Sequence, residues 1–450
     1  FNRIQRKVNF LKGLEAQTRK DPKAFPRTPG DDGAAQAATD ALRFVCDDND
    51  WNSTRSDNFE AIIVEGTTAV MVGARQAQQG IDPSIVLIPW DRFYYDPHSR
   101  SYKFDDAAYM GIVTWLDYDD AVDRWPDRQD ILDATMSNTR ASDTYDDRPK
   151  EGLWADPRRK RVRINEEYYK TGGTWMTCKY TGGGFLEDPM PSPYIGADGK
   201  PENPICAISA YVDRDNNRYG EVRALISPQD EVNKRRSKGM HLINSRQMRI
   251  SRSAGIDASA AKRELAKPDG VLIADVGEVE PIQTGDMAAA NFQMLAEAKA
   301  ALDKQGKTAA LQGKNENELS GRAMLAQQQG GMTEIALLMD RLRHLSLAVY
   351  DKVWARVRQY WTTQRWIRVT DDPRDPQFVG LNQPQTMLEV AQQRLQGDPQ
   401  APQKLALLAR DPRAHQVIQI KNQVAQLDVD IEMVEGKDTR TVQVEQYDTL

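Results

Sequence analysis

The sequence predicts a mainly α fold of the α+β class, and three observations support this prediction. Residues 219–362 read in order as a helix, a small β insert, a second helix, a polar loop and a very long helix. Apolar residues recur in this region at intervals of three and four, as they do on one face of a helix. Alternating residues on both sides of Thr171-Gly172-Gly173 predict a β-hairpin instead.

The first helix of this core is predicted over residues 227–250. Ser227 can cap a helix with its hydroxyl, and Pro228 has the backbone angle that a first turn needs. Six basic residues lie along the helix: Lys234, Arg235, Arg236, Lys238, Arg246 and Arg249. Because the segment has few large apolar residues, we expect it either to pack within an assembly or to face a polyanion.

A small β unit is predicted over residues 251–285. Residues 270–275 form a strand-like apolar run, and residues 276–282 mix Val and Ile with Glu and Pro. Asp269-Gly270 is a turn signal between the extended segments.

A second helix is predicted over residues 286–304, with Asp286 as its cap. Phe292, Leu295, Ala298 and Leu302 recur there at helical spacing. The polar residues 305–319 that follow are predicted to form a loop, and they include Lys307 and Lys314.

A very long helix is predicted over residues 320–362. Its apolar stripe consists of Ile335, Leu338, Leu342, Leu345, Val349, Val353, Val357 and Tyr360. The part that carries the stripe, about 30 residues with a rise of 1.5 Å each, is roughly 45 Å long. Gly330 and Gly331 predict a kink, because each glycine weakens a helix by about 1 kcal/mol relative to Ala.

The flanking regions are predicted to mix helices and strands. Residues 1–66 and 386–426 read as mostly helical, and residues 182–203 as irregular. Strands are expected at residues 70–74, 84–88, 161–169, 174–180 and 427–435. Residues 437–450 read as the start of a helix, and we expect further residues beyond both ends.

Composition excludes several classes of protein. The chain has 450 residues, 60 Lys and Arg against 66 Asp and Glu, and a net charge of −6, which argues against a protein that coats itself with nucleic acid. No run of about 18 apolar residues exists, so no transmembrane helix is expected. Three scattered cysteines fit a reducing compartment without a disulfide framework.

No sequence motif predicts a catalytic site. Gly306-Lys307-Thr308 has the ending of a phosphate-binding loop, but Ala301 stands where the pattern needs Gly. Residues 213–217 resemble a calcium loop but lack its Gly and its final Glu, so a surface turn is the better interpretation. No histidine lies at ligand spacing from a Cys or a carboxylate. We therefore expect no catalytic residues, no metal and no cofactor.

Two charged clusters leave alternatives open. An acidic cluster of Asp117, Asp119, Asp120 and Asp123 either is a solvated helix face or holds a metal in a nuclease. The basic run at residues 158–163 leads directly into a strand. An interface-facing or solvated strand is a better interpretation of this run than a DNA contact.

The order of core elements resembles that of the portal proteins of short-tailed bacteriophages. Three flanking segments share the resemblance: NRIQRKVNFLKGLEAQTRKDPKAFPRTP at residues 2–29, IPWDRFYYDPHSRSYKFDDAAYMG at residues 88–111 and FVGLNQP at residues 378–384. In the second, Trp90, Asp96, Pro97 and Asp106 match the wing motif. The resemblance spans most of the chain.

The resemblance implies a portal fold with eight regions. They are an N-terminal wing region at 1–226, a first stem helix at 227–250, a β clip at 251–285, a second stem helix at 286–304, a tunnel loop at 305–319, a long kinked helix at 320–362, a C-terminal wing region at 363–436, and the start of a truncated crown helix at 437–450. Lys307 and Lys314 would then lie near moving DNA.

The implied function is conduction of DNA without catalysis. The resemblance implies a dodecameric ring at one capsid vertex of the virion, assembled in the host cytoplasm, through which double-stranded DNA passes non-specifically during packaging and ejection. Its implied partners are the large terminase, then tail adaptor proteins, with capsid and scaffolding proteins and no membrane. The alternatives are a metal-dependent DNA-processing enzyme that uses the acidic cluster, and a non-viral helical scaffold protein.

Overall fold

The computed structural model describes most of the chain and contains both helices and sheets. The described residues are 2–27, 32–78, 80–138, 153–244, 247–252, 255–267, 269–273, 275, 277–282, 285–304, 321–369, 377–395, 400–427 and 429–435. They belong to two compact units. Unit 1 comprises residues 1–11 and 221–336, and unit 2 comprises residues 12–220 and 337–450.

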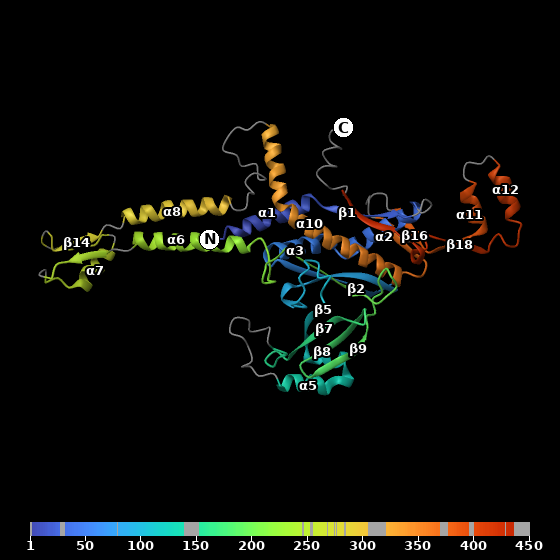
Figure 1. The fold of residues 1–450 in the computed structure, drawn as a ribbon, viewed down its shortest axis with the longest axis horizontal. Helices are drawn as coiled ribbons and strands as arrows, with labels where there is room; N and C mark the ends of the chain where they lie inside the picture. Colours follow the sequence, from blue (N-terminus) through green and yellow to red (C-terminus); the bar gives the residue numbers. More distant parts are fainter. Residues whose placement is uncertain are drawn as a thin grey trace. The chain divides into compact units, whose positions relative to one another are not determined.

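Unit 1 is built around two helices. Figure 1 shows α6 and α8 side by side, with β13, β14 and α7 at one end of the pair. The bounds are α6 Arg223–Asn244, β13 Gln247–Ile250, α7 Ala258–Ala266, β14 Val279–Ile282 and α8 Gly285–Lys304. The first residues of α1 (Ile4–Gln17) and of α10 (Gly321–Tyr360) also belong to this unit.

An apolar seam and a side-chain amide hold α6 and α8 together. Leu225 and Val232 of α6 are buried against Leu295, Ala298 and Leu302 of α8, and Ile4 of α1 packs on the same cluster. Such burial, rather than helix propensity, supplies most of the stability of paired helices.

Gly239 lets the two helices approach closely. A Cβ atom at Gly239 would lie 2.9 Å from Asn291 Nδ2 and 3.1 Å from the ring of Phe292. The free space admits the Asn291 amide, which donates a 2.8 Å hydrogen bond to the backbone carbonyl of Arg235.

The predicted bounds of the first core helix were wrong at both ends. α6 begins at Arg223, before the predicted Ser227, because burial of Leu225 stabilises an additional turn, and Pro228 lies inside the helix. α6 ends at Asn244, so Arg249 does not lie on it. Arg249 belongs instead to β13, where it is directly opposite Glu280 of β14.

The predicted strand at residues 270–275 was also wrong. β13 and β14 pair with each other in antiparallel register, and residues 270–273 form no strand. The side chains of Val271 and Ile273 are 76% and 92% exposed. The helix α7, which the sequence did not predict, precedes this segment and is capped by Asp257.

Unit 2 combines several sheets with helices. Its elements are β1 Lys20–Pro26, α2 Asp32–Asp48, α3 Trp51–Val64, β2 Thr67–Ala77, β3 Gly80–Ile88, η1 Trp90–Arg92, β4 Phe93–Tyr95, β5 Tyr109–Asp117, α4 Tyr118–Arg124, η2 Pro126–Arg128, α5 Gln129–Asn138, β6 Ala155–Asp156, β7 Arg161–Thr171, β8 Thr174–Thr181, β9 Gly184–Pro191, β10 Ile205–Ser209, β11 Tyr211–Val212, β12 Arg218–Tyr219, β15 Arg365–Val369, β16 Gln377–Leu381, β17 Gln383–Thr386, α11 Met387–Arg394, α12 Ala401–Leu408, β18 Val417–Lys421, η3 Val424–Gln426 and β19 Val429–Glu435.

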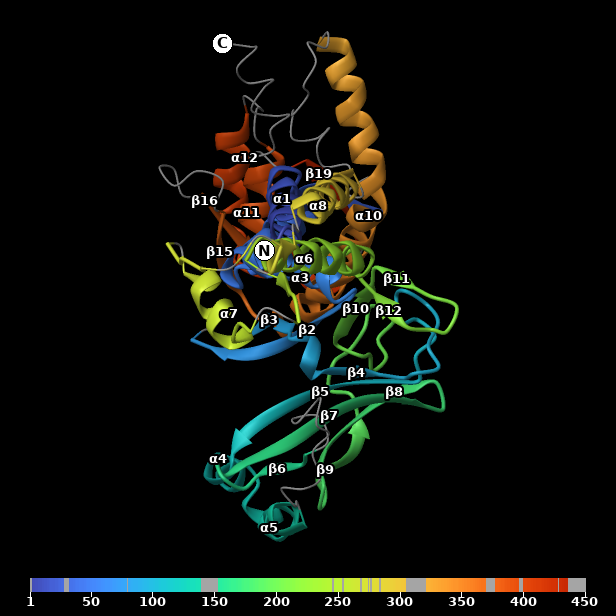
Figure 2. The ribbon, with the colours of Figure 1, turned by 90° about the vertical axis from the view of Figure 1, so that its left-hand side faces the viewer.

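Two sheets organise most of this unit. One has the strand order β10-β2-β3, and the other has the order β4-β5-β7-β8-β9, with β6 paired to β7. Figure 2 shows α4 and α5 beside the second sheet. Their residues Ala121 and Leu132 are buried with Val162, Ile164 and Leu186 of its strands. A smaller pair, β1 and β19, brings residues 20–26 against residues 429–435.

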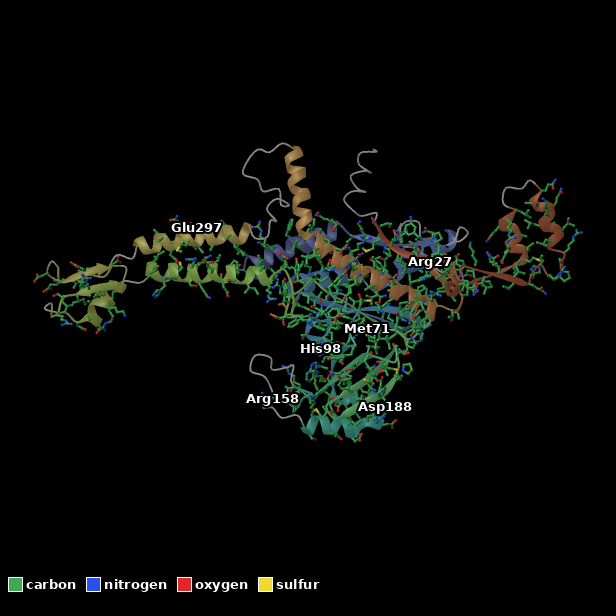
Figure 3. All side chains as sticks on the ribbon, in the orientation of Figure 1. Arg27, Met71, His98, Arg158, Asp188 and Glu297 are labelled. Carbon is green, nitrogen blue, oxygen red and sulfur yellow. The ribbon has the colours of Figure 1, made fainter. Side chains whose placement is uncertain are left out.

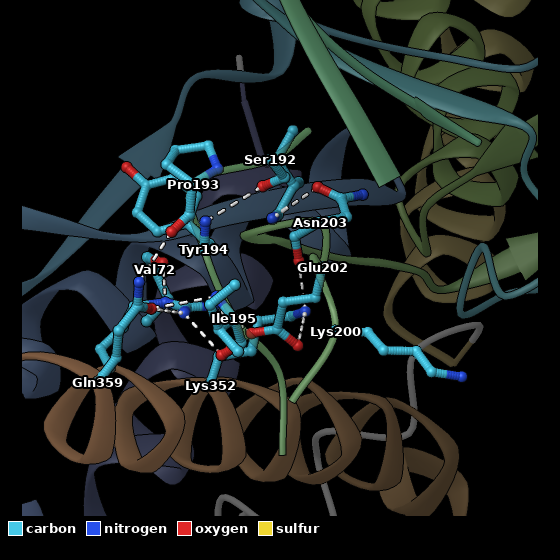
Figure 4. A network of polar contacts seen from close by, with 12 residues as sticks. Val72, Ser192, Pro193, Tyr194, Ile195, Lys200, Glu202, Asn203, Lys352 and Gln359 are labelled. Atoms are coloured by element: carbon cyan, nitrogen blue, oxygen red, sulfur yellow. Dashed lines mark hydrogen bonds and ion pairs between the residues drawn. The ribbon is translucent and has the colours of Figure 1, made fainter. Parts of the chain in front are cut away.

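α10 is anchored in unit 2 by a buried guanidinium. Arg356 has no exposed surface and forms an ion pair with Glu202. Its Nη1 donates to the carbonyl of Ile195 at 3.0 Å, and its Nε donates to the carbonyl of Val72 at 3.4 Å. Figure 4 labels the partners Val72, Ile195 and Glu202 beside the helix, and the contacts join the helix to β2 and to residues 192–203.

Several expectations for the flanking regions are confirmed. β2, β3, β7, β8 and β19 lie at the predicted strand positions, and Gly172 and Gly173 form the turn of the predicted hairpin with positive φ angles. β1 and β9 were not predicted. Within the described part of the chain, no helix has the length and apolar character that crossing a bilayer requires.

Replacing Glu202 with Gln should destabilise unit 2. The change removes the charge that faces the Arg356 guanidinium, and a hydrogen bond to a charged group contributes about 1.5–3 kcal/mol. We expect the free energy of unfolding to fall by about 2 kcal/mol in chemical denaturation. Asp198→Asn, a change of the same kind in the exposed turn nearby, is the control and should have little effect. Equal stability of both variants would show that the pair does not hold α10.

Candidate interface surfaces

The basic side chains of α6 lie mostly at its surface. Lys234, Arg236 and Lys238 are exposed, whereas Arg235 forms an ion pair with Glu231, at 2.6 Å between Nη2 and Oε1. Arg235 also contacts Met294 of α8, at 3.2 Å between Nη1 and Sδ. Arg246, predicted on the same helix, lies outside the described residues.

The first half of α6 carries charges of both signs. A shallow hollow of about 590 Å³ is lined by Arg223, Ile226, Ser227, Asp230, Glu231, Lys234 and Arg235. A surface that alternates acidic and basic groups fits a protein partner with complementary charges better than a polyanion. This observation favours an interface role for this part of α6.

The structure describes the residues of the predicted kink but not those of the predicted loop. Residues 305–319, with Lys307 and Lys314, lie outside the described residues. Gly330 and Gly331 lie within α10, whose helical assignment runs from Gly321 to Tyr360. Their role as a kink remains a prediction.

The segment between β4 and β5, which carries the wing motif, is held by two carboxylates. Asp96 accepts hydrogen bonds from the backbone N–H groups of Ala108 and His98, and these lower the pKa of its carboxyl group. Asp106 accepts from the Ser99 hydroxyl at 2.6 Å and from the N–H of Arg100 at 2.7 Å. These bonds hold the pKa of Asp106 at about 2.

Arg218 fixes the same segment from the other side. Its guanidinium donates to the carbonyls of Ser99 and Ser101 and lies 3.9 Å from the ring centroid of Phe104. Burial lowers the pKa of this guanidinium. Asp96, Asp106 and Arg218 therefore stabilise the conformation of the segment between β4 and β5.

The acidic cluster gives no support to a metal site. Asp117 forms an ion pair with Arg161, at 2.7 Å between Oδ1 and Nε. Among the described residues, no three His, Cys, Asp or Glu side chains come together as metal ligands. Asp213, in the loop that resembles a calcium site, accepts the backbone N–H groups of Asp215 and Asn217 and so forms a surface turn.

Sequence reasoning missed the exposed apolar tip beside β14. Val271 and Ile273 were interpreted as strand residues, but both point to solvent. The sequence alone could not separate the two possibilities, because a short apolar run gives the same pattern in a strand and in an exposed segment. Exposed large apolar residues that lie close together are typical of a docking surface.

Two comparisons with known proteins bear on the family of this chain. A family model described as "Phage P22-like portal protein" matches residues 1–450. A search of curated proteins finds no match.

Proposed function

The chain belongs to the P22-like phage portal protein family, and on that premise we propose that it forms a closed ring around a DNA channel at one capsid vertex. The match over residues 1–450 is the observation that carries the proposal. The paired helices α6 and α8, with a small β unit at one end, are consistent with it. In such a ring each copy would present one face to its neighbour on one side and a different face on the other.

We assign the regions of a portal to the elements of this chain. The stem is α6 and α8, and the clip comprises residues 251–285 together with β13. The tunnel loop comprises residues 305–319, and α10 is the long helix. Residues 1–226 and 363–436, which precede and follow these core elements in the sequence, form the wing, and residues 437–450 begin the crown.

The clip is the proposed docking site for the large terminase during packaging and for tail adaptor proteins afterwards. Its exposed Val271 and Ile273 support this role, because exposed apolar side chains gain from being covered by a partner. Capsid and scaffolding proteins would contact the ring during assembly.

DNA would pass through the ring without being read. Backbone phosphates are the same along any duplex, so contacts to them carry no sequence information. Lys307 and Lys314 would supply the few phosphate contacts.

Portal proteins are structural proteins, and the described residues offer no competing chemistry. The alternative of a metal-dependent DNA-processing enzyme required the carboxylates near Asp117 to converge. Asp117 is paired with Arg161, and no metal-binding group is found in the described part of the chain.

Electron microscopy of the purified protein tests the ring. We expect closed, dodecameric rings with a central channel, because repeated contacts between two different faces close into a ring when the rotation per copy is right. Compact particles without a channel would refute the proposal.

Replacing Lys307 and Lys314 with Ala should weaken DNA binding by the ring without affecting its assembly. Each lost phosphate contact reduces the slope of log affinity against log salt concentration by about 0.9. The measurement is binding of linear duplex DNA over a range of salt concentrations. Lys200→Ala, at an exposed turn of unit 2, is the control. Unchanged slopes would remove both lysines from the DNA path.

Replacing Gly330 and Gly331 with Ala tests whether α10 bends at this pair. Each alanine stabilises the helical conformation by about 1 kcal/mol relative to glycine. The two changes should therefore make α10 harder to bend at this point, and a bend that DNA passage requires would cost more free energy. We expect packaging to slow or packaged DNA to leak, measured in a packaging assay with assembled rings. A variant with normal packaging and retention would show that flexibility at the pair is not needed.

A further inference from the structure

One face of the second sheet of unit 2 carries aromatic side chains where polar ones are expected. Strand residues alternate between the two faces of a sheet, and a solvent-facing side is normally polar. Met110 and Tyr168 are buried on one face. The opposite face, fixed by the register that pairs Gly111 with Tyr94 and with Glu167, carries six aromatic residues. They are Tyr94, Tyr109, Trp115, Tyr169, Tyr180 and Phe185.

A hollow of about 370 Å³ lies on this face, over β7, β8 and β9. Its lining includes Glu167, Tyr169, Cys178, Tyr180, Phe185 and Pro189. Among the described residues that line it, Glu167 carries the charge. Phe185 at its rim is 45% exposed.

The carboxylate in the hollow is held in position by two phenols. The Tyr180 hydroxyl donates a 2.8 Å hydrogen bond to Oε2 of Glu167, and the Tyr94 hydroxyl lies 3.4 Å from the same oxygen. Tyr94 can lie across β5 because residue 111 is Gly, where a Cβ atom would come within 2.2 Å of the ring. The site is therefore preformed within one copy of the chain.

A carboxylate surrounded by aromatic rings is suited to an organic cation. Aromatic faces attract guanidinium and ammonium groups, and Glu167 supplies a full negative charge. Arginine satisfies both partners at once, because its planar group can stack on a ring while it donates to a carboxylate.

The turn before β7 provides cations of this kind. Arg158, Arg159 and Lys160 are all exposed. Asp156 Oδ1 accepts the backbone N–H groups of Arg158 and Arg159, so the turn is preformed. Figure 3 shows Arg158 and Asp188 of β9 at the left and the right of the sheet, so the turn and the outer edge strand lie apart in this view.

We propose that the turn at residues 157–160 of one copy docks into the Glu167 hollow of the neighbouring copy, where Arg158 or Arg159 pairs with the carboxylate. The inference rests on the proposed ring, because a ring contact joins two different faces of the same chain. The proposed occupant of the open sheet face is a second copy of this chain, because the acidic, aromatic hollow and the basic turn are complementary in charge.

A charge swap tests the contact in the ring. Glu167→Arg alone and the pair Arg158→Glu with Arg159→Glu should each raise the protein concentration needed for half-assembly about tenfold, measured by sedimentation. All three changes together should restore assembly to within about threefold of wild type, since the opposite charges meet again. Lys200→Glu reverses an exposed charge outside the proposed contact, so this control variant should assemble normally.

Two further measurements keep the outcomes distinct. Glu167→Gln retains a hydrogen-bond acceptor for the two phenols. If this variant has a normal melting temperature but assembles weakly, the loss of charge and not misfolding is the cause.

A synthetic peptide of residues 155–162 should bind the protein even if no ring forms, and should bind at least tenfold more weakly to Glu167→Gln. A monomer that binds the peptide in this way would refute the ring but support the site. The inference is wrong if the variant with all three changes assembles no better than the two partial variants. It is also wrong if the peptide binds equally well to the wild type and to Glu167→Gln.

Discussion

The buried guanidinium of Arg356 is the constraint on which the arrangement of unit 2 depends. A charge in a protein interior is tolerated only when it is paired and its donors are satisfied. Arg356 meets this requirement with groups from two segments distant in sequence, the carbonyl of Val72 in β2 and the Ile195–Glu202 segment. Lys352, one turn earlier, donates to the carbonyl of Asn203 at 2.5 Å, so α10 binds this segment twice. Because both donors are on one helix face, the rotation of α10 against the sheet is fixed as well as its position.

Arg218 fixes the segment between β4 and β5 with a different set of acceptors. Its Nη1 and Nη2 donate to the carbonyls of Ser101 and Ser99 and to the Ser99 hydroxyl, and its flat face covers the ring of Phe104. Asp96 and Asp106 then bond to backbone N–H groups of the same segment. An irregular segment can therefore be as well defined as a strand, provided that its backbone groups find side-chain partners. Asp96 and Asp106, which carry the resemblance of this segment to portal proteins, are thus residues that stabilise its fold.

How well the sequence predicted the structure depended on how local the deciding interactions are. α8, α10 and the hairpin of β7 and β8 were predicted because periodicity and Gly172-Gly173 are local signals. The early start of α6 was missed because burial of Leu225 against α8, a contact across some 70 residues of sequence, outweighs the signal from Ser227 and Pro228. β1 was missed for the same reason, since its partner is β19 at the other end of the chain. The basic residues of α6 were identified, but their sequence did not show that Arg235 is committed to Glu231.

The sequence predicted least well those surfaces on which a single copy of the chain exposes apolar side chains. Val271 and Ile273 extend into solvent, and Tyr169, Tyr180 and Phe185 form an open face, although apolar area left in water forgoes about 25 cal/mol per Å². A monomer gains nothing from such residues, whereas a ring that closes around a channel and binds successive partners recovers their burial at each contact. Patterns read from one chain describe burial within that chain, so they assign these residues to a strand or leave them unexplained. In the proposed ring a second copy or a docking partner would cover these residues, and that burial is the physical reason for their exposure in a single chain.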